Sequence, residues 1–424
     1  MLLRNLCLYD PAAGIDGQQV SLLVQEGKIA AVLPPDTPHT DEAEMDLSGL
    51  CAAPGLVDMH VHLREPGGTH KEDILSGCRA AAAGGVTSLL CMPNTIPCAD
   101  SAGVISYVLE RAEQADARVY PVGAVTYELA GEQMTDFAAL KKAGAIAVSD
   151  DGRPDEDPAL MQAALQSARD NGMLLLAHCE KMALAGGGLV HEGHASQILG
   201  VKGMPRQAEF LSVAEAIEAA EKTGCAVHIC HVSCAESVQI LRAAQARGVR
   251  VTAETCPQYY SLTEKEVLGR DADYRMNPPL RERSDVLAVK EGLKDGTIAV
   301  LATDHAPHSV QEKADFDKAP NGVIGMETAL AAAITYLVRT GEMTMGQVIE
   351  RMSAFPAKLM GLPAGTLAAG SAADIVIFDP NVSFTVDPQR LHGKSRNAVY
   401  KGKTLFGQVE YTLLGGKIVY KRGE

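Results

Sequence analysis

The sequence lacks the features that define three large classes of protein. Lys and Arg total 38 against 53 Asp and Glu, for a formal net charge of −15, and no segment gathers basic residues into a stripe that could follow phosphates. No apolar run approaches the ~18 residues of a membrane span, and polar residues interrupt the opening MLLRNLCLYDPAAG every few positions. We therefore expect a cytoplasmic protein that is neither secreted nor bound to membrane or nucleic acid.

Cysteine is present, but not in the patterns of a disulfide-rich or C-x-x-C protein. The 10 cysteines are spread between Cys7 and Cys256 of a 424-residue chain, which is far below the density of a small secreted scaffold. Reduced thiols fit this distribution best. Low-complexity segments and long internal repeats are also missing.

The centre of the chain alternates short apolar, β-branched runs with alanine-rich segments of helical spacing, such as Leu211–Lys222 and Ala235–Arg247. The candidate strands are Gly55–Met59, Val86–Cys91, Val119–Ala124, Ala145–Ser149, Met173–Ala177, Ala226–Cys230, Val251–Thr255 and Ile298–Thr303. This rhythm is typical of an α/β protein with a parallel sheet. The number of strands, and the lack of a G-x-G-x-x-G turn, favour a closed (β/α)8 TIM-type barrel over an open doubly wound sheet.

The two ends of the chain carry short alternating segments broken by Gly, Pro and Asp. Expected strands are Leu2–Tyr9, Val20–Val24, Lys28–Leu33, Asp374–Phe378, Val409–Leu414 and Lys417–Tyr420. Each end is too short to form a sound core by itself. We therefore predict that residues 1–52 and 365–424 pair into one small antiparallel β-sandwich beside a barrel formed by residues 53–364.

The run GLVDMHVHLREPG places His60 and His62 two residues apart at the end of an apolar strand. Side chains two apart on a strand point to the same face, so both imidazoles can reach one metal ion. A lone H-x-H pair is weak evidence, because paired histidines also serve as ordinary polar groups.

Other potential ligands occupy the same place in the rhythm, at or just after the end of a strand: Asp151, His178, His231 and Asp304. In a barrel all these strand ends converge on one mouth. Histidines with carboxylates suit a borderline divalent ion such as zinc, and a bridging carboxylate could hold two ions about 3.5–4 Å apart. The alternative, polar strand-end residues that only bond to loops, stays open at this point.

Longer motifs along nearly the whole chain carry a resemblance to a known family. They are GLVDMHVHLREPG (55–67), CMPNT (91–95), SDDG (149–152), AHCE (177–180), HEGHASQILGVKGMPRQAE (191–209), CHVS (230–233), ETCPQYY (254–260), RMNPPLR (275–281), ATDHAPH (302–308) and GTLAAGSAADIVIFDP (365–380). With these motifs the chain resembles the amidohydrolase superfamily and, within it, the class I bacterial dihydroorotases. HLREPG, SDDG, MNPPLR and DHAPH are the more specific ones.

The resemblance implies a site for one or two zinc ions. His60, His62 and Asp304 would bind one ion, His178 and His231 would bind a second, and Asp151 would bridge them. Asp150 also fits the sequence, but the spacing from Asp151 to His178 matches the family pattern better.

The bridging residue also separates this chain from its neighbours. Many relatives, including hydantoinases and allantoinases, use a carboxylated lysine as the bridge, whereas GAIAVSDDGRP contains no lysine and the nearest upstream ones, Lys141 and Lys142, fall in a helical stretch. This difference favours a dihydroorotase over another cyclic amidohydrolase. A third reading is a non-catalytic structural partner of aspartate transcarbamoylase, which the intact ligand set disfavours.

The implied activity is the reversible hydrolysis of the cyclic amide of dihydroorotate to N-carbamoyl-L-aspartate, in pyrimidine (UMP) biosynthesis. The guanidinium of Arg64 suits the substrate carboxylate, and the resemblance implies that Asn94 and His308 complete that clamp. His62, Asn277 and the backbone of Asn321 and Gly322 would contact the rest of the substrate.

Three of these assignments have ordinary structural alternatives. Arg64 could pair with Glu65, and Asn94 and Asn277 could be turn residues beside prolines. Asn321 stands where the family usually has an aromatic residue, so the ring contacts are expected to differ slightly.

Asp304 is expected to act both as a metal ligand and as the group that carries a proton from water to the amide nitrogen. A homodimer and a complex with aspartate transcarbamoylase are the associations that the resemblance allows.

Overall fold

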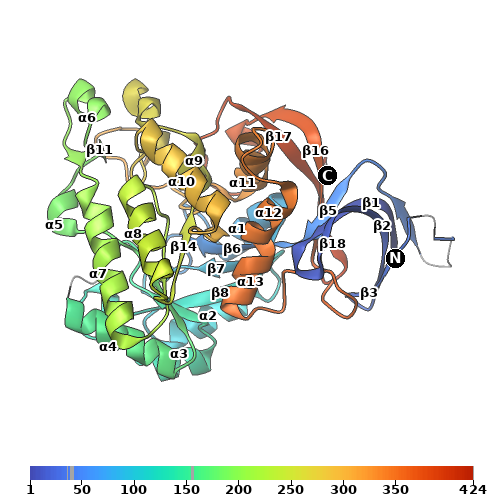
Figure 1. The fold of residues 1–424 in the computed structure, drawn as a ribbon, viewed down its shortest axis with the longest axis horizontal. Helices are drawn as coiled ribbons and strands as arrows, with labels where there is room; N and C mark the ends of the chain where they lie inside the picture. Colours follow the sequence, from blue (N-terminus) through green and yellow to red (C-terminus); the bar gives the residue numbers. More distant parts are fainter. Residues whose placement is uncertain (36, 39–42, 154–156, 424) are drawn as a thin grey trace.

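A parallel eight-stranded barrel forms the centre of the computed structural model, which describes residues 1–35, 37–38, 43–153 and 157–423 (Figure 1). Its strands follow one another around the barrel in chain order: β6 (Leu56–Val61), β7 (Val86–Cys91), β8 (Arg118–Ala124), β9 (Ala147–Ser149), β10 (Leu174–Ala177), β13 (Val227–Ile229), β14 (Val251–Thr255) and β15 (Val300–Leu301). The predicted barrel is confirmed, with strands close to the expected positions.

The barrel closes between β15 and β6 through side-chain as well as backbone bonds. Val61 forms an isolated parallel bridge with His305, and the His62 amide donates to the His305 carbonyl at 2.8 Å. The Asp58 carboxylate accepts from the Thr303 amide at 3.1 Å and from its hydroxyl at 2.6 Å. The strand itself, β15, is shorter than the expected Ile298–Thr303.

Helices surround the barrel (Figure 1). They are α1 (Ile74–Ala83), α2 (Ala102–Ala112), α3 (Phe137–Ala143), α4 (Pro158–Asp170), α7 (Gln207–Thr223), α8 (Ala235–Ala246), α10 (Arg283–Asp295), α11 (Met326–Ala333), α12 (Met345–Ile349) and α13 (Phe355–Met360). An excursion after β10 contains α5 (Met182–Ala185), β11 (Val190–His191), α6 (His194–Leu199) and β12 (Gly203–Met204), and α9 (Pro257–Ser261) follows β14.

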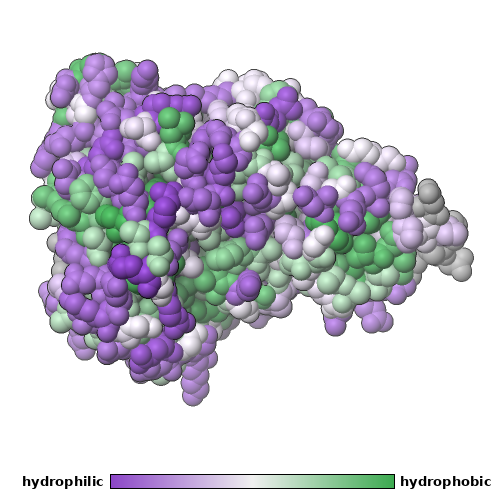
Figure 2. Space-filling model, viewed as in Figure 1, coloured by the Kyte–Doolittle hydropathy of each residue, from purple (hydrophilic) through white to green (hydrophobic). Residues whose placement is uncertain are grey.

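Apolar side chains fill the barrel interior and the layer between the barrel and its helices. Met59, Leu90, Val122 and Val300 are buried inside the barrel. The opposite faces of the helices are polar, and Figure 2 shows hydrophilic residues over much of the helical layer in this view. This division is the one expected when each helix buries a single apolar stripe.

Both ends of the chain meet in a second eight-stranded sheet, as expected, with the order β18-β17-β16-β5-β1-β2-β3 and with β4 beside β1. The strands are β1 (Leu2–Asp10), β2 (Ile15–Gln25), β3 (Lys28–Leu33), β4 (Glu44–Asp46), β5 (Cys51–Pro54), β16 (Ile375–Thr385), β17 (Thr404–Leu414) and β18 (Lys417–Lys421). Figure 1 shows this sheet curling around itself beside the barrel. Leu3, Leu6, Leu22, Ile375 and Leu413 are buried in its own core.

The pairing within this sheet differs from the expectation in one respect. The two ends pair antiparallel where β16 meets β5, but β1 pairs parallel with both β4 and β5. After the β1–β2–β3 meander the chain crosses to the free side of β1 and then runs in the same direction as β1. The expectation of antiparallel pairing throughout was therefore wrong for these two pairs.

Each of the ten cysteines, which all lie in the described part of the chain, is free. None of the helices in the described ranges is long and apolar enough to cross a membrane.

Candidate metal centre and active site

The structure brings the six predicted metal ligands together at one mouth of the barrel. They come from the ends of five strands: His60 and His62 from β6, Asp151 after β9, His178 after β10, His231 after β13 and Asp304 after β15. All six are buried, with at most 8% of any residue exposed. The convergence follows from the parallel strands, whose carboxyl ends all face the same way.

Three residues form the first group around Asp151. His60 Nε2 lies 3.3 Å from Asp151 Oδ1, and His62 Nε2 lies 3.5 Å from Asp151 Oδ2. Asp304 Oδ1 completes the group at 3.2 Å from His62 Nε2 and 3.6 Å from His60 Nε2.

A second group shares the same carboxylate. His178 Nδ1 lies 3.3 Å from Asp151 Oδ1 and 2.9 Å from His231 Nε2, which is 3.8 Å from Asp151 Oδ1. Asp151 therefore faces four histidines, three at Oδ1 and one at Oδ2, and both His60–His62–Asp151 and Asp151–His178–His231 could hold a metal ion.

The donor atoms fit a divalent metal. Ligands about 2.0–2.2 Å from a tetrahedral zinc ion lie about 3.4 Å from one another, close to the separations found here. His60 Nε2 is buried and makes no hydrogen bond with any residue in the described ranges. Burial alone would lower the pKa of His178, but its hydrogen bonds to Asp151 and Glu180 raise that pKa to about 10. The surroundings of His178 thus favour a positive charge, which either a second ring proton or a bound metal ion can supply.

The neighbouring carboxylate, Asp150, has a different task. It accepts from the amides of Val125 at 2.7 Å and Thr126 at 3.0 Å, and so holds the turn after β8. Lys141 and Lys142 lie exposed on α3. The residue that faces the four histidines is thus Asp151, not Asp150 or either of the nearest upstream lysines.

Three ligand histidines have their outer ring nitrogen held by another side chain. His60 Nδ1 contacts Glu254 Oε1 at 2.7 Å, and His62 Nδ1 contacts Asn94 Oδ1 at 2.8 Å. His178 Nε2 contacts Glu180 Oε2 at 3.1 Å. Because an oxygen acceptor fixes a proton on the outer nitrogen, the inner nitrogen is the one that a metal can bind.

Glu254 and Glu180 were not among the predicted site residues. The available signals were a carboxylate inside the apolar strand Val251–Thr255, and a carboxylate two residues after the strand-end His178. Neither signal says which ring nitrogen the carboxylate would meet, so the structure was needed to find these contacts.

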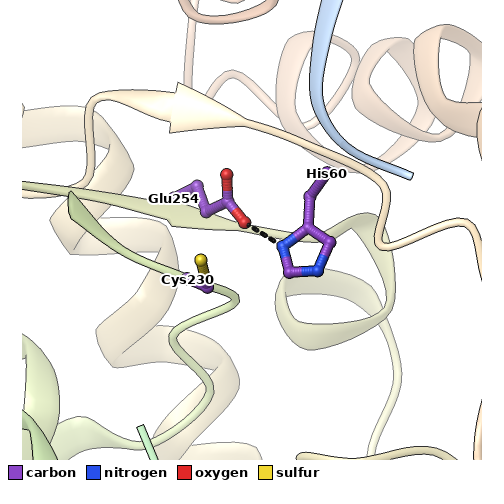
Figure 3. A group of neighbouring side chains, drawn as sticks. All are labelled: His60, Cys230 and Glu254. Atoms are coloured by element: carbon purple, nitrogen blue, oxygen red, sulfur yellow. Dashed lines mark hydrogen bonds and ion pairs between the residues drawn. The ribbon is translucent and has the colours of Figure 1, made fainter. Parts of the chain in front are cut away.

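Glu254 lies inside the barrel, where Figure 3 shows its carboxylate bonded to the His60 ring beside Cys230. Its other oxygen lies 3.2 Å from His228 Nε2. Burial alone would raise the pKa of Glu254, but His60 and His228 hold it well below its usual range. Burial raises the pKa of Cys230 well above the usual value, so the thiol stays protonated. Cys230 is consequently a neighbour of the centre in its thiol form.

Three site residues adopt a left-handed backbone: Arg64 with φ 60°, His231 with φ 36° and Asp304 with φ 49°. Non-glycine residues take this conformation infrequently, and such strain tends to gather at functional sites. Here all three residues follow the carboxyl end of a barrel strand, at the mouth where the candidate ligands gather.

Arg64 presents a guanidinium without an acidic partner. Its Nε donates to the Pro307 carbonyl at 3.2 Å, its Nη2 lies 3.4 Å from His308 Nε2, and no carboxylate in the described residues lies within 4.0 Å. Burial lowers the pKa of Arg64 to about 10, which leaves it charged at neutral pH. Glu65 pairs instead with Arg111 at 3.1 Å, so a structural Arg64–Glu65 bridge is ruled out.

His308 and the loop that follows it come close to Arg64. Burial and then the charge of Arg64 lower the pKa of His308 to about 2, so the ring is neutral and its Nε2 donates to the Asn321 carbonyl at 2.9 Å. The side chain of Asn321 accepts from Arg275 Nη2 at 3.2 Å. A Cβ on Gly322 would lie 2.9 Å from His308 Nε2, so only glycine lets the backbone approach this closely.

Asn94 and Asn277 are more than turn residues. Asn94 Nδ2 donates to Asp151 Oδ2 at 3.4 Å while its Oδ1 contacts His62. Asn277 Nδ2 donates to Glu180 Oε2 at 2.8 Å. Asn94 therefore lies beside the predicted metal ligands, and Asn277 reaches His178 through Glu180.

A closed barrel with two histidine groups sharing one carboxylate defines a metal-dependent hydrolase of the amidohydrolase type. Solved structures agree with this class. L-hydantoinase (dihydropyrimidinase) from Arthrobacter aurescens matches with a TM-score of 0.89 and 25% identity over 100% of this chain and 96% of that one. Dihydropyrimidinase from Brevibacillus agri NCHU1002 matches with a TM-score of 0.85 and 25% identity over 100% and 95%.

Sequence comparison narrows the class further. The family model described as Dihydro-orotase-like matches residues 49–237. The dihydroorotase of Pelotomaculum thermopropionicum is 47% identical over 99% of this chain and 98% of its own length, and that of Geobacter metallireducens is 44% identical over 100% of both. The chain belongs to the dihydroorotase family and is a cyclic amide hydrolase.

Proposed function

We propose that this protein interconverts dihydroorotate and N-carbamoyl-L-aspartate in pyrimidine biosynthesis, with two zinc ions held on either side of Asp151. Two observations together carry the proposal. Asp151 is shared by both groups of histidines, and Arg64, two residues beyond His62, is a cation without a carboxylate partner in the described residues. The first feature supports amide hydrolysis, and the second supports a substrate that bears a carboxylate.

His60, His62 and Asp304 would hold the first ion, and His178 and His231 the second. When bound, such ions make a water molecule more acidic and polarise the amide carbonyl. The carboxylate of Asp304 takes a proton from the attacking water and delivers it to the ring nitrogen as the C–N bond breaks. In the reverse direction, Asp304 takes the proton from the carbamoyl nitrogen and returns it to the departing oxygen.

The remaining side chains bind and orient the substrate. Arg64 offers two parallel N–H groups to its carboxylate, and Asn94 and His308 assist. Asn277 and the Gly322 backbone face the ring. Because the Asn321 side chain is engaged by Arg275, Asn321 contributes through its backbone.

A hydantoinase or allantoinase activity is the second candidate, since the solved structures named above are an L-hydantoinase and a dihydropyrimidinase. The position of Asp151 among the histidines and the exposure of Lys141 and Lys142 argue against it, because the resemblance described above associates those activities with a carboxylated lysine as the bridge. The cytoplasmic location, the homodimer, the complex with aspartate transcarbamoylase and the division into residues 1–52 with 365–424 and residues 53–364 stay predictions.

The test compares three substrates on one preparation. Purified protein is assayed on dihydroorotate, allantoin and hydantoin, before and after chelation and again after zinc is restored, with metal content measured in parallel. We expect turnover of dihydroorotate alone, lost on chelation and recovered with about two zinc ions per chain. Preferential turnover of hydantoin or allantoin would establish the second candidate. Full metal content without turnover of any of the three would point to a structural partner.

A further inference from the structure

Glu180 is a buried carboxylate with no cationic side chain from Lys or Arg beside it. It follows β10, is 7% exposed, and in the described residues its ion-pair partner is His178. Burying a carboxylate in such surroundings is costly unless its oxygens receive good hydrogen bonds. The contacts of Glu180 therefore show what the carboxylate is there to hold.

One oxygen of Glu180 holds two groups of the site at once. Oε2 lies 3.1 Å from His178 Nε2 and 2.8 Å from Asn277 Nδ2. His178 comes from the end of β10, whereas Asn277 comes from the loop between α9 and α10. Glu180 thus connects a metal ligand to a residue that faces the substrate ring.

For His178 the contact selects one tautomer. A carboxylate oxygen can only accept, so the ring proton lies on Nε2. Nδ1 is then the ring nitrogen left for a metal ion, and it faces Asp151 Oδ1, 3.3 Å away, and His231 Nε2, 2.9 Å away.

For Asn277 the same contact selects one orientation of the side-chain amide. Since Oε2 can only accept, the amide nitrogen must face Glu180, and the carbonyl Oδ1 is turned to the opposite side of the amide. Asn277 therefore offers a fixed acceptor, which is complementary to the N–H of a cyclic amide or imide.

We propose that Glu180 is a positioning residue that couples the two halves of the site, fixing His178 for the metal and turning the Asn277 carbonyl toward a ring N–H of the substrate. This inference rests on the proposed function. Glu254 differs in that its second partner is the core residue His228, so its influence ends at the metal.

Three variants separate this role from a general loss of structure. Glu180→Leu keeps the approximate size but removes the acceptor, whereas Glu180→Gln can keep both bonds through its amide oxygen. Glu254→Gln is the comparison variant, because it touches His60 and no substrate residue. Zinc affinity is measured by competition with a chelator, and KM and kcat for dihydroorotate are measured at saturating zinc.

We expect Glu180→Leu to lower zinc affinity about 10- to 100-fold and to raise KM for dihydroorotate by at least about tenfold. Glu180→Gln should recover most of both losses. Glu254→Gln should weaken zinc binding without a change in KM at saturating zinc.

The decisive comparison adds Asn277→Ala. Once Asn277 is removed, Glu180→Leu should raise KM no further, because the carboxylate acts on substrate binding through Asn277. Independent, multiplying increases in KM would overturn the proposal, as would unchanged zinc affinity in Glu180→Leu. Absence of dihydroorotate turnover in the unmodified protein would instead refute the proposed function, and the zinc measurement would still test the role of Glu180 at His178.

Discussion

Replacing Arg64 by Met removes the guanidinium while keeping a long apolar side chain in its place. Arg64 is charged at neutral pH and is not committed to any carboxylate in the described residues, so its two N–H groups are available for that of the substrate. A hydrogen bond to a charged group contributes about 1.5–3 kcal/mol. If Asn94 and His308 retain part of the substrate binding, loss of the two bonds from Arg64 should weaken binding by about 3–4 kcal/mol. At about 1.4 kcal/mol for each factor of ten, KM for dihydroorotate should rise roughly 100- to 1,000-fold with a much smaller change in kcat.

The assay pairs dihydroorotate with dihydrouracil, which has the same ring without the carboxylate. Arg64→Met should lose its preference for dihydroorotate, while its zinc content and any turnover of dihydrouracil stay near those of the unmodified protein. Arg64→Lys, which keeps the charge but not the planar fork, should fall between the two. An unchanged KM for dihydroorotate, or equal losses on both substrates, would remove Arg64 from the carboxylate site.

Three other changes probe the catalytic carboxylate, the metal and the barrel closure. Asp304→Asn should retain most of the zinc but lose about 10²- to 10⁴-fold in turnover in both directions, and near-normal turnover would refute its role in proton transfer. Without metal, the pKa of His178 is about 10, so zinc must displace a proton from this ring near neutral pH. Calorimetry in buffers of different ionisation enthalpy should therefore show proton release on zinc binding, and the zinc affinity should rise with pH. Zinc binding that does not depend on pH would contradict this. Asp58→Ala leaves three hydrogen-bond donors without their acceptor, namely the His60 amide and the amide and hydroxyl of Thr303. Denaturant titrations should show a free energy of unfolding lower by about 3 kcal/mol or more, and a smaller loss for Asp58→Asn.

The barrel and the convergence of the six candidate ligands could be predicted because both follow from regular geometry. A period of two brings His60 and His62 to one face, and the parallel arrangement brings every strand end to one mouth. No such rule places Glu254 and Glu180 against particular ring nitrogens, because that depends on side-chain conformations in neighbouring strands. The parallel pairing of β1 with β4 and β5 was missed for a related reason, since an alternating sequence does not encode the direction of its partner.

The choice between adjacent carboxylates shows the same limit. Asp150 and Asp151 both follow β9, and the sequence favoured Asp151 only through its spacing to His178. The structure separates them because the Val125 and Thr126 amides occupy Asp150, which leaves Asp151 to face the histidines.

The shared carboxylate is the centre of this account, and anomalous diffraction tests it directly. Crystals of zinc-loaded protein would be measured on both sides of the zinc absorption edge. We predict two anomalous peaks about 3.5–4 Å apart, one against His60, His62 and Asp304 and the other against His178 and His231, with Asp151 between them. No peak next to Asp151, or a peak held by Cys230 and Glu254 instead, would contradict the proposed metal centre.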